Sequence, residues 1–152
     1  MAITQAMSTL FKKDVLLGDH HLDSDNIYVA LYTSSATLNA TTDGYITANE
    51  VANGNGYTTG GNALASKAVT EDTNSGSTTA GSGIFDADDP QWTSATFTAR
   101  GALIYNKTLG DASSNARGAI AILDFGGDFS VSGGTFRIVF PAATKDTAIV
   151  RI

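Results

Sequence analysis

The sequence predicts a mainly β fold, an antiparallel β-sandwich or jelly roll with one N-terminal helix. Three observations favour this class. Segments rich in β-branched and aromatic residues begin at residue 27, loops separate them at intervals of roughly eight to twelve residues, and a helical period is confined to the start of the chain. A length of 152 residues with a hydrophobic fraction of 42% suits a single domain, residues 1–152, with its own core.

The first segment, residues 2–17, predicts an amphipathic helix. Its apolar residues recur at spacings of three and four, and Gly18 follows as a C-terminal stop signal. Residues 1–18 are therefore expected to form an N-terminal helix or arm. The residues that set the spacing are Ile3, Ala6, Met7, Leu10, Phe11 and Leu17.

The next segments predict β-structure with long connections. Residues 27–33 predict a central strand, because both faces of this segment are apolar. Residues 71–89 are serine- and glycine-rich over most of their length and predict a flexible loop insert. Between them we expect a polar loop over 34–44, an edge strand near 45–51, a glycine-rich turn system over 53–62 and a weak strand over 63–70.

The second half of the chain is more regular. Strands are expected over 93–107 (bent at Gly101), 116–125, 129–140 and 148–152, with a short glycine turn over 126–128. Pro141 ends the third of these strands. Roughly eight strands should therefore follow the helix, as in a sandwich of antiparallel sheets.

Composition excludes several classes of protein. The chain has no cysteine, so it contains no disulfide, thiol nucleophile or cysteine-type zinc site. A net charge of −6 argues against a nucleic-acid partner, which needs a basic face. No apolar run approaches the roughly 20 residues of a membrane span, so no membrane partner is expected.

Both histidines lie in the polar segment 19–26, together with three aspartates. Imidazole and carboxylate groups are common metal ligands and acid–base pairs, so an enzyme built here would use His20 or His21 with Asp23 or Asp25. We favour a solvated turn instead, because adjacent side chains of an extended chain point to opposite sides.

Asp86, Asp88 and Asp89 are the candidate metal ligands. Oxygen ligands at alternate positions are typical of calcium loops. However, Gln91 stands where such a loop requires glycine, and Phe97 stands where it requires glutamate. We therefore favour an acidic turn ahead of a strand, with a non-standard calcium or magnesium site as the alternative.

The remaining motifs do not assemble a catalytic set. Asp124-Phe125-Gly126 matches the metal-binding tripeptide of kinases without any other kinase motif, and is interpreted as a strand end that enters a hairpin. The glycines at 54–61 do not fit a phosphate-binding loop. Trp92 is expected in the core, with a sugar-stacking platform as the alternative. We predict no catalytic residue, no cofactor and no enzymatic activity.

Six sequence blocks carry a resemblance to a known family. They are MAITQAMSTLFKKDVLLGDHHL (1–22), VALYTSSATLNATT (29–42), ANEVANGNGYTTGGNAL (48–64), WTSATFTARGALIYN (92–106), AIAILDFGGDFSVSGGTFRIVFP (119–141) and TAIVRI (147–152). In these blocks the chain resembles a family of small structural proteins encoded by tailed bacteriophages. TFTARGALIYN and GYTTGGNAL are the most specific parts, and residues 71–89 are where the chain departs from the family.

The resemblance implies a virion component that is assembled in the bacterial cytoplasm and has no catalytic residue. We expect a head decoration (cement) protein that bridges and stabilises major-capsid subunits. Its expected partners are the major capsid protein and copies of itself, as a trimer. A chain without cysteine suits a reducing cytoplasm, and acidic charge opposes association of open sheet edges.

The N-terminal helix and the loops at 33–62 are the expected contacts with capsid subunits. Two alternatives stay open. The first is a tail, neck or fibre component of the virion, including a receptor- or glycan-binding module. The second is a free carbohydrate-binding sandwich, for which calcium at residues 86–89 would be the distinguishing feature.

Overall fold

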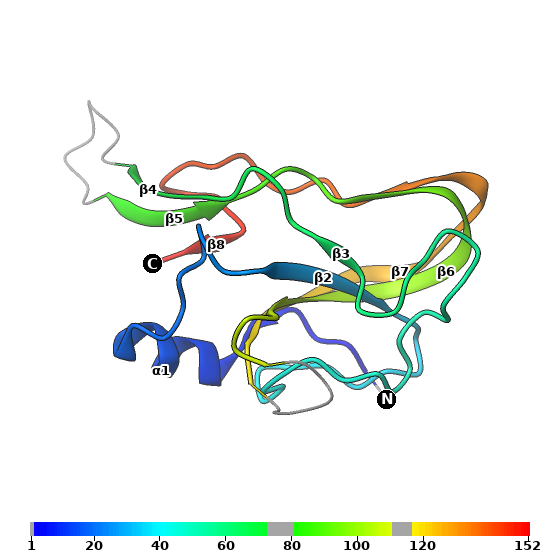
Figure 1. Ribbon diagram of the computed structural model, residues 1–152, viewed down its shortest axis with the longest axis horizontal. Helices are drawn as coiled ribbons and strands as arrows, with labels where there is room; N and C mark the ends of the chain where they lie inside the picture. The colour runs from blue at the N-terminus through cyan, green and yellow to red at the C-terminus, as the bar shows by residue number, and fades with distance from the viewer. Residues whose placement is uncertain (1, 73–80, 111–116) are drawn as a thin grey trace.

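The computed structural model describes residues 2–72, 81–110 and 117–152. The chain is mainly β with antiparallel sheets and a single short helix near the N-terminus, which confirms the predicted fold class (Figure 1). One sheet has the order β1-β7-β6-β2-β3 and the other the order β4-β5-β8. The elements are β1 (Ala6–Met7), α1 (Thr9–Leu17), β2 (Ile27–Tyr32), β3 (Asn62–Ala63), β4 (Ala68–Asp72), β5 (Ser82–Asp86), β6 (Gln91–Asn106), β7 (Ala119–Arg137) and β8 (Val150–Arg151).

Strands β6 and β7 are long and curve together round one end of the molecule (Figure 1). The curve falls where Ala99 pairs with Phe129 and Gly101 pairs with Asp124, so that β7 has four unpaired residues opposite one residue of β6. Such a bulge bends a strand without ending it. The predicted hairpin turn over 126–128 is therefore wrong, and Asp124-Phe125-Gly126 lies within a continuous strand rather than at a strand end.

Gly101 lies at the bend, at a position where there is no room for a side chain. A Cβ atom at this position would lie 2.5 Å from the carbonyl oxygen of Leu123 and 2.9 Å from the side chain of Ile3. The bend brings both halves of β6 to a shared core, since Trp92 near its start and Ile104 near its end belong to one buried cluster. The core position expected for Trp92 is thus confirmed.

Strand β2 is central, as its two apolar faces predict. It pairs with β6 along its whole length and with β3 on the other side. Residues on its two faces belong to two buried clusters, with Val29 and Leu31 in one and Ala30 and Tyr32 in the other. A strand buried on both faces needs a near-continuous apolar sequence, which IYVALY supplies.

The N-terminal helix is shorter than predicted. Ile3 bridges Leu38, and β1 pairs with Ala121 and Ile122 of β7, so residues 2–7 run as extended chain along the sheet edge. Apolar residues in this part cover the sheet in an extended conformation rather than as the face of a helix. The predicted end at Gly18 is confirmed, since its N–H bonds back to the carbonyl oxygen of Val15.

Two expectations for the middle of the chain are corrected. Residues 45–51 form no regular strand; Glu50 makes one isolated bridge to Tyr32. Within the expected loop insert 71–89, Glu71 and Asp72 belong to β4 and residues 82–86 form β5, because the two segments pair as an antiparallel hairpin. Residues 87–89 are in no regular element, and residues 73–80 lie outside the described residues.

Candidate functional site

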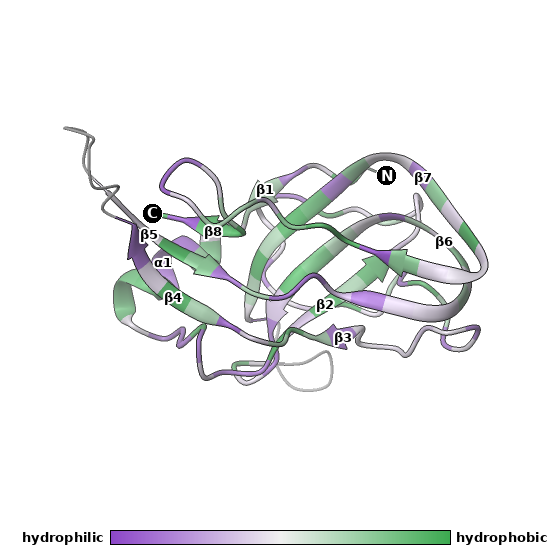
Figure 2. Ribbon diagram, turned by 90° about the horizontal axis from the view of Figure 1, so that it is seen from above, coloured by the Kyte–Doolittle hydropathy of each residue, from purple (hydrophilic) through white to green (hydrophobic). Residues whose placement is uncertain are grey.

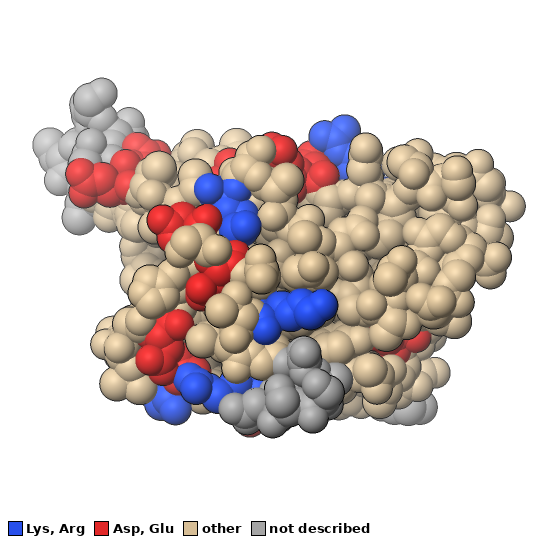
Figure 3. Space-filling model, viewed as in Figure 1, with Lys and Arg blue, Asp and Glu red and all other residues tan. Residues whose placement is uncertain are grey.

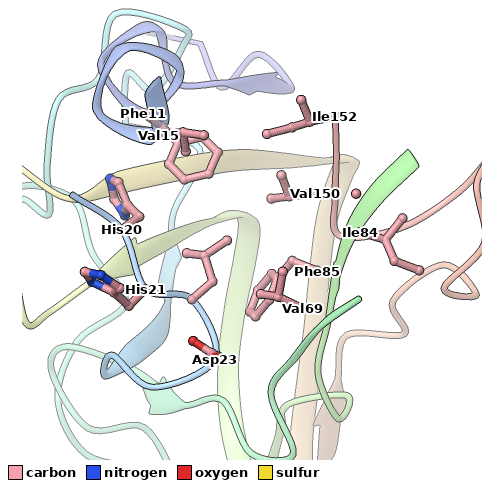
Figure 4. A pocket seen from close by; sticks show the side chains of 12 residues that line it. Phe11, Val15, His20, His21, Asp23, Val69, Ile84, Phe85, Val150 and Ile152 are labelled. Carbon is pink, nitrogen blue, oxygen red and sulfur yellow. The ribbon is translucent and has the colours of Figure 1, made fainter. Parts of the chain in front are cut away.

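A cleft of about 400 Å³ opens at the end of the molecule where α1 faces β4, β5 and β8. Figures 1 and 2 show these elements gathered opposite to the bend in β6 and β7. Figure 4 shows Phe11 and Val15 of α1 on one side of this end cleft, with Phe85 and Val150 facing them. The lining is mainly apolar, and is completed by His20, His21, Leu22, Asp23, Val69, Gly83, Ile84 and Ile152.

Apolar side chains are exposed in the end cleft and elsewhere on α1. Val69 and Ile152 line it and are 53% and 70% exposed. Leu16 and Leu17, which follow the lining residue Val15, are 87% and 66% exposed. Figure 3 shows acidic and basic side chains interspersed over the same half of the molecule. An exposed apolar surface with charged groups around it suits a protein-binding site.

The two predicted histidines lie side by side at the end cleft but are held differently (Figure 4). The ring of His20 packs edge-on against Phe11, with centroids 4.8 Å apart. Its Nδ1 atom lies 3.3 Å from the amide nitrogen of Asn106, and its Nε2 atom is buried without a hydrogen-bond partner among the described residues. His21 is exposed, and its backbone N–H donates to Asp25.

Burial lowers the pKa of His20, and the nearby carboxylates of Asp14 and Asp25 offset this only in part. His20 is not paired directly with a carboxylate. Instead, Asn106 approaches its ring and also donates a 2.6 Å hydrogen bond to Asp25. Asn106 is fully buried, and the sequence did not indicate its role, since it directly follows the largely apolar segment Gly101–Tyr105 of β6. The arrangement fixes the turn at 19–26 against β6.

The three candidate metal ligands line one hollow, and two of them, Asp88 and Asp89, are held by hydrogen bonds of their own. Asp88 accepts from the hydroxyl of Ser66 at 2.6 Å, whereas Asp89 accepts from Arg137 at 2.6 Å and from the N–H of Phe140 at 2.8 Å. The N–H of Phe140, aided by Arg137 and opposed by desolvation, holds the pKa of Asp89 below its usual range. Asp86 ends β5 opposite Ala68. Within residues 2–72, 81–110 and 117–152, no three His, Cys, Asp or Glu side chains converge as metal ligands do.

An ion cluster joins α1 to the segment that precedes β7. The carboxylate of Asp14 in α1 is fully buried and contacts Arg117 at 3.2 Å and Lys13 at 3.3 Å. Arg117 also contacts Asp19 at 2.9 Å. Burial alone would raise the pKa of Asp14, but the hydrogen bonds from Arg117 and Lys13 outweigh it and keep the pKa below the usual value. This cluster, which no sequence motif indicates, fixes α1 to the segment ahead of β7.

The glycine-rich segment 53–62 is held by a carboxylate and does not cradle a phosphate. Glu50 accepts hydrogen bonds from the hydroxyls of Tyr45 and Tyr57, both at 2.6 Å, and from the N–H of Gly60 at 2.7 Å. Tyr105 in β6 donates in turn to the carbonyl oxygen of Gly60. The loop expected to contact the capsid is therefore fastened to the sheet at several points.

A second hollow, of about 460 Å³, lies along β7, and we call it the edge groove. Phe125, Phe129, Val131 and Phe136 line it, and Phe129 is 53% exposed. Strict alternation over 129–140 would place Phe129 and Phe136 on opposite faces. The irregular pairing of β7 between Ser132 and Gly134 brings them to the same face, and so the sequence pattern alone did not predict this groove.

No protein-family model matches the chain, and no curated protein or solved structure shows significant similarity to it. Among the described residues, no helix has the length and apolar character that crossing a membrane requires.

Proposed function

We propose that this protein is a structural component of a tailed-phage virion, a head decoration protein that bridges major-capsid subunits and stabilises them. The end cleft is the observation that carries the proposal. It presents an apolar hollow beside α1, an element expected to contact the capsid, and the same helix also exposes Leu16 and Leu17 to solvent. The resemblance of the sequence blocks to phage structural proteins supplies the biological setting.

The chemistry of the described residues suits such a role. The polar clusters join segments of the chain to one another: Asp14 with Arg117, Asp89 with Arg137, and Glu50 with Tyr57. The end cleft, by contrast, presents apolar surface to the outside. A cement protein uses many weak contacts of this kind, because binding at one subunit junction raises the effective concentration at the next.

The capsid test uses heads and tails purified from the phage that encodes this protein. We expect the labelled protein to bind heads and not tails, and the L16E variant to lose most of its head binding. T9E is the matched control, since it adds the same charge to an exposed position at the other end of α1. Binding to tails alone would instead support the tail, neck or fibre alternative, and unchanged binding by L16E would remove the exposed face of α1 from the contact.

A further inference from the structure

One edge of β7 is open between Asp128 and Arg137. Strand β6 pairs with this segment on one side, whereas β1 pairs only with Ala121 and Ile122, so no described strand pairs with the other side. Open edges expose backbone N–H and C=O groups, and proteins usually protect them with lysine, proline or charges that point inward. Residues 129–136 contain no proline and no charged residue.

The sequence of this edge, DFSVSGGTFR, is complementary to itself when a second copy runs antiparallel to it. If the centre of the paired segment lies between Ser132 and Gly133, Asp128 of one copy lies opposite Arg137 of the other at each end. Phe129 of one copy then lies opposite Phe136 of the other. The inner positions place Ser130 opposite Thr135, Val131 opposite Gly134 and Ser132 opposite Gly133. Opposite charges, paired aromatic rings and paired hydroxyls are the cross-strand combinations that stabilise a sheet.

The bulge at Gly133 makes this register possible. In a regular strand, residues whose numbers add to an odd total lie on opposite faces, so that Phe129 and Phe136 could not meet. Here Ser132 pairs with Thr96 and Gly134 with Ala95, which leaves Gly133 as an extra residue. As a result, the members of each proposed pair share a face. On the core side these are Phe129, Val131, Gly134 and Phe136, whose β6 partners Ala99, Phe97, Ala95 and Trp92 pack in or against the core.

We propose that β7 binds the β7 strand of a second copy in antiparallel register, with a two-fold axis between Ser132 and Gly133. Phe129, half exposed at the edge groove, would then be covered by Phe136 of the second copy. Asp128 is exposed and forms no ion pair with any described residue, so it is available to Arg137 of the other chain. Arg137 already contacts Asp89, and Arg117 in this chain shows that one guanidinium can hold two carboxylates.

The contact is isologous, since the same edge serves both copies. It is a two-fold contact and so differs from the three-fold assembly expected from the resemblance. It uses the edge groove and not the end cleft. Self-association through β7 therefore does not depend on capsid binding, and the two can fail separately.

The charge pairs are tested by sedimentation of the purified protein from micromolar to millimolar concentration. We expect a reversible dimer, and D128R should raise its dissociation constant by about tenfold, because each end of the contact then places two arginines opposite each other. D43R is the matched control, since it makes the same charge change at another exposed residue and should dimerise as the wild type does. A monomer throughout, or equal dissociation constants for D128R and wild type, would overturn the proposal.

The register is tested by cross-linking, for which a cysteine-free chain gives no background. Ser130 and Thr135 are opposite in the proposed pairing, at a Cβ separation of about 5 Å that a disulfide can span after a small adjustment. The S130C and T135C variants, mixed and mildly oxidised, should therefore give a mixed disulfide dimer. S130C alone should stay uncross-linked, because its two copies lie about 17 Å apart along the strands. Rapid cross-linking of S130C alone, or none in the mixture, would refute this register.

Discussion

The hydroxyl of Tyr57 donates a 2.6 Å hydrogen bond to Glu50 and accepts one of 2.9 Å from the backbone N–H of Leu31. The phenol thus links the glycine-rich loop to the central strand β2. Burial, together with the hydrogen bond to Glu50, raises the pKa of Tyr57 above its ordinary value, so that the hydroxyl keeps its proton. A segment without regular secondary structure is ordered here by side-chain hydrogen bonds.

Replacing Tyr57 with phenylalanine should lower the free energy of unfolding by about 1–3 kcal/mol, because Leu31 N–H and Glu50 both lose a buried partner. Urea denaturation measures the change. Y28F is the control, since the Tyr28 hydroxyl makes no hydrogen bond among the described residues, and its effect should stay within about 0.5 kcal/mol. Equal losses in the two variants would contradict this role of Tyr57.

Gly61 and Gly126 form a matched pair for a steric prediction. Both have φ of 78°, a conformation that alanine adopts only with strain. A Cβ at Gly61 would overlap the carbonyl oxygen of Val29 in β2, whereas a Cβ at Gly126 would meet no atom within 4 Å. We expect G126A to cost about 1–2 kcal/mol of unfolding free energy and G61A at least about 2 kcal/mol more. If the two variants gave similar melting curves, steric overlap with Val29 would not be the reason that G61A is destabilised.

Removing the guanidinium with R117A should destabilise the fold most at neutral pH. In the wild type the pKa of Asp14 is below 3.8, so its contribution is present above that value and is lost as the pH falls through the folded-state pKa. Without Arg117, only Lys13 opposes the effect of burial, so the pKa of Asp14 should rise from its wild-type value. Protonation of Asp14 then removes the cost of burying a carboxylate that has lost its arginine partner. The stability difference between R117A and wild type should therefore shrink below about pH 4. Denaturant unfolding across this range tests it, and a difference that grows on acidification would contradict it.

His20 should lower stability in mild acid. Its folded-state pKa lies below the ordinary 6.5, so the unfolded chain binds a proton more readily, and stability falls as the pH drops from 6.5 through the folded-state value. H20N keeps an acceptor for Asn106 but cannot titrate, and it should lose less stability than the wild type over the same window. Parallel losses in both proteins would show that another group is responsible. An NMR titration of the His20 ring checks the pKa directly.

Local sequence patterns predicted the elements whose environment is uniform along their length. The apolar run of β2, the strand around residues 93–107 and the helix end at Gly18 were all correctly placed. The predicted helix over 2–17 was too long, because a three-and-four spacing of apolar residues also suits an extended segment packed along a sheet edge. The glycines at 126 and 127 predict a turn, but they belong to a bulge within β7.

The candidate site was less predictable, because its residues come from distant segments. The end cleft combines α1 with β4, β5 and β8, and no single motif relates these parts. Two of the contacts near it join residues that are remote in sequence, namely Asn106 with Asp25 and Arg117 with Asp14. Another contact, between Glu50 and Gly60, spans the glycine-rich loop. The aspartates at 86–89, predicted as an acidic turn or metal site, fasten neighbouring segments through their own hydrogen bonds.

Composition and local periodicity are enough to predict the antiparallel β class, the lack of any disulfide and the acidic charge. Where apolar surface stays open, by contrast, depends on how distant segments pack. The bulge at Gly133 in β7 changes the face of every residue after it and so brings Phe129 and Phe136 to one face, and the exposure of Leu16 depends on which segments pack beside α1. Such relations arise from packing across the chain, and they decide the surfaces on which both proposals rest.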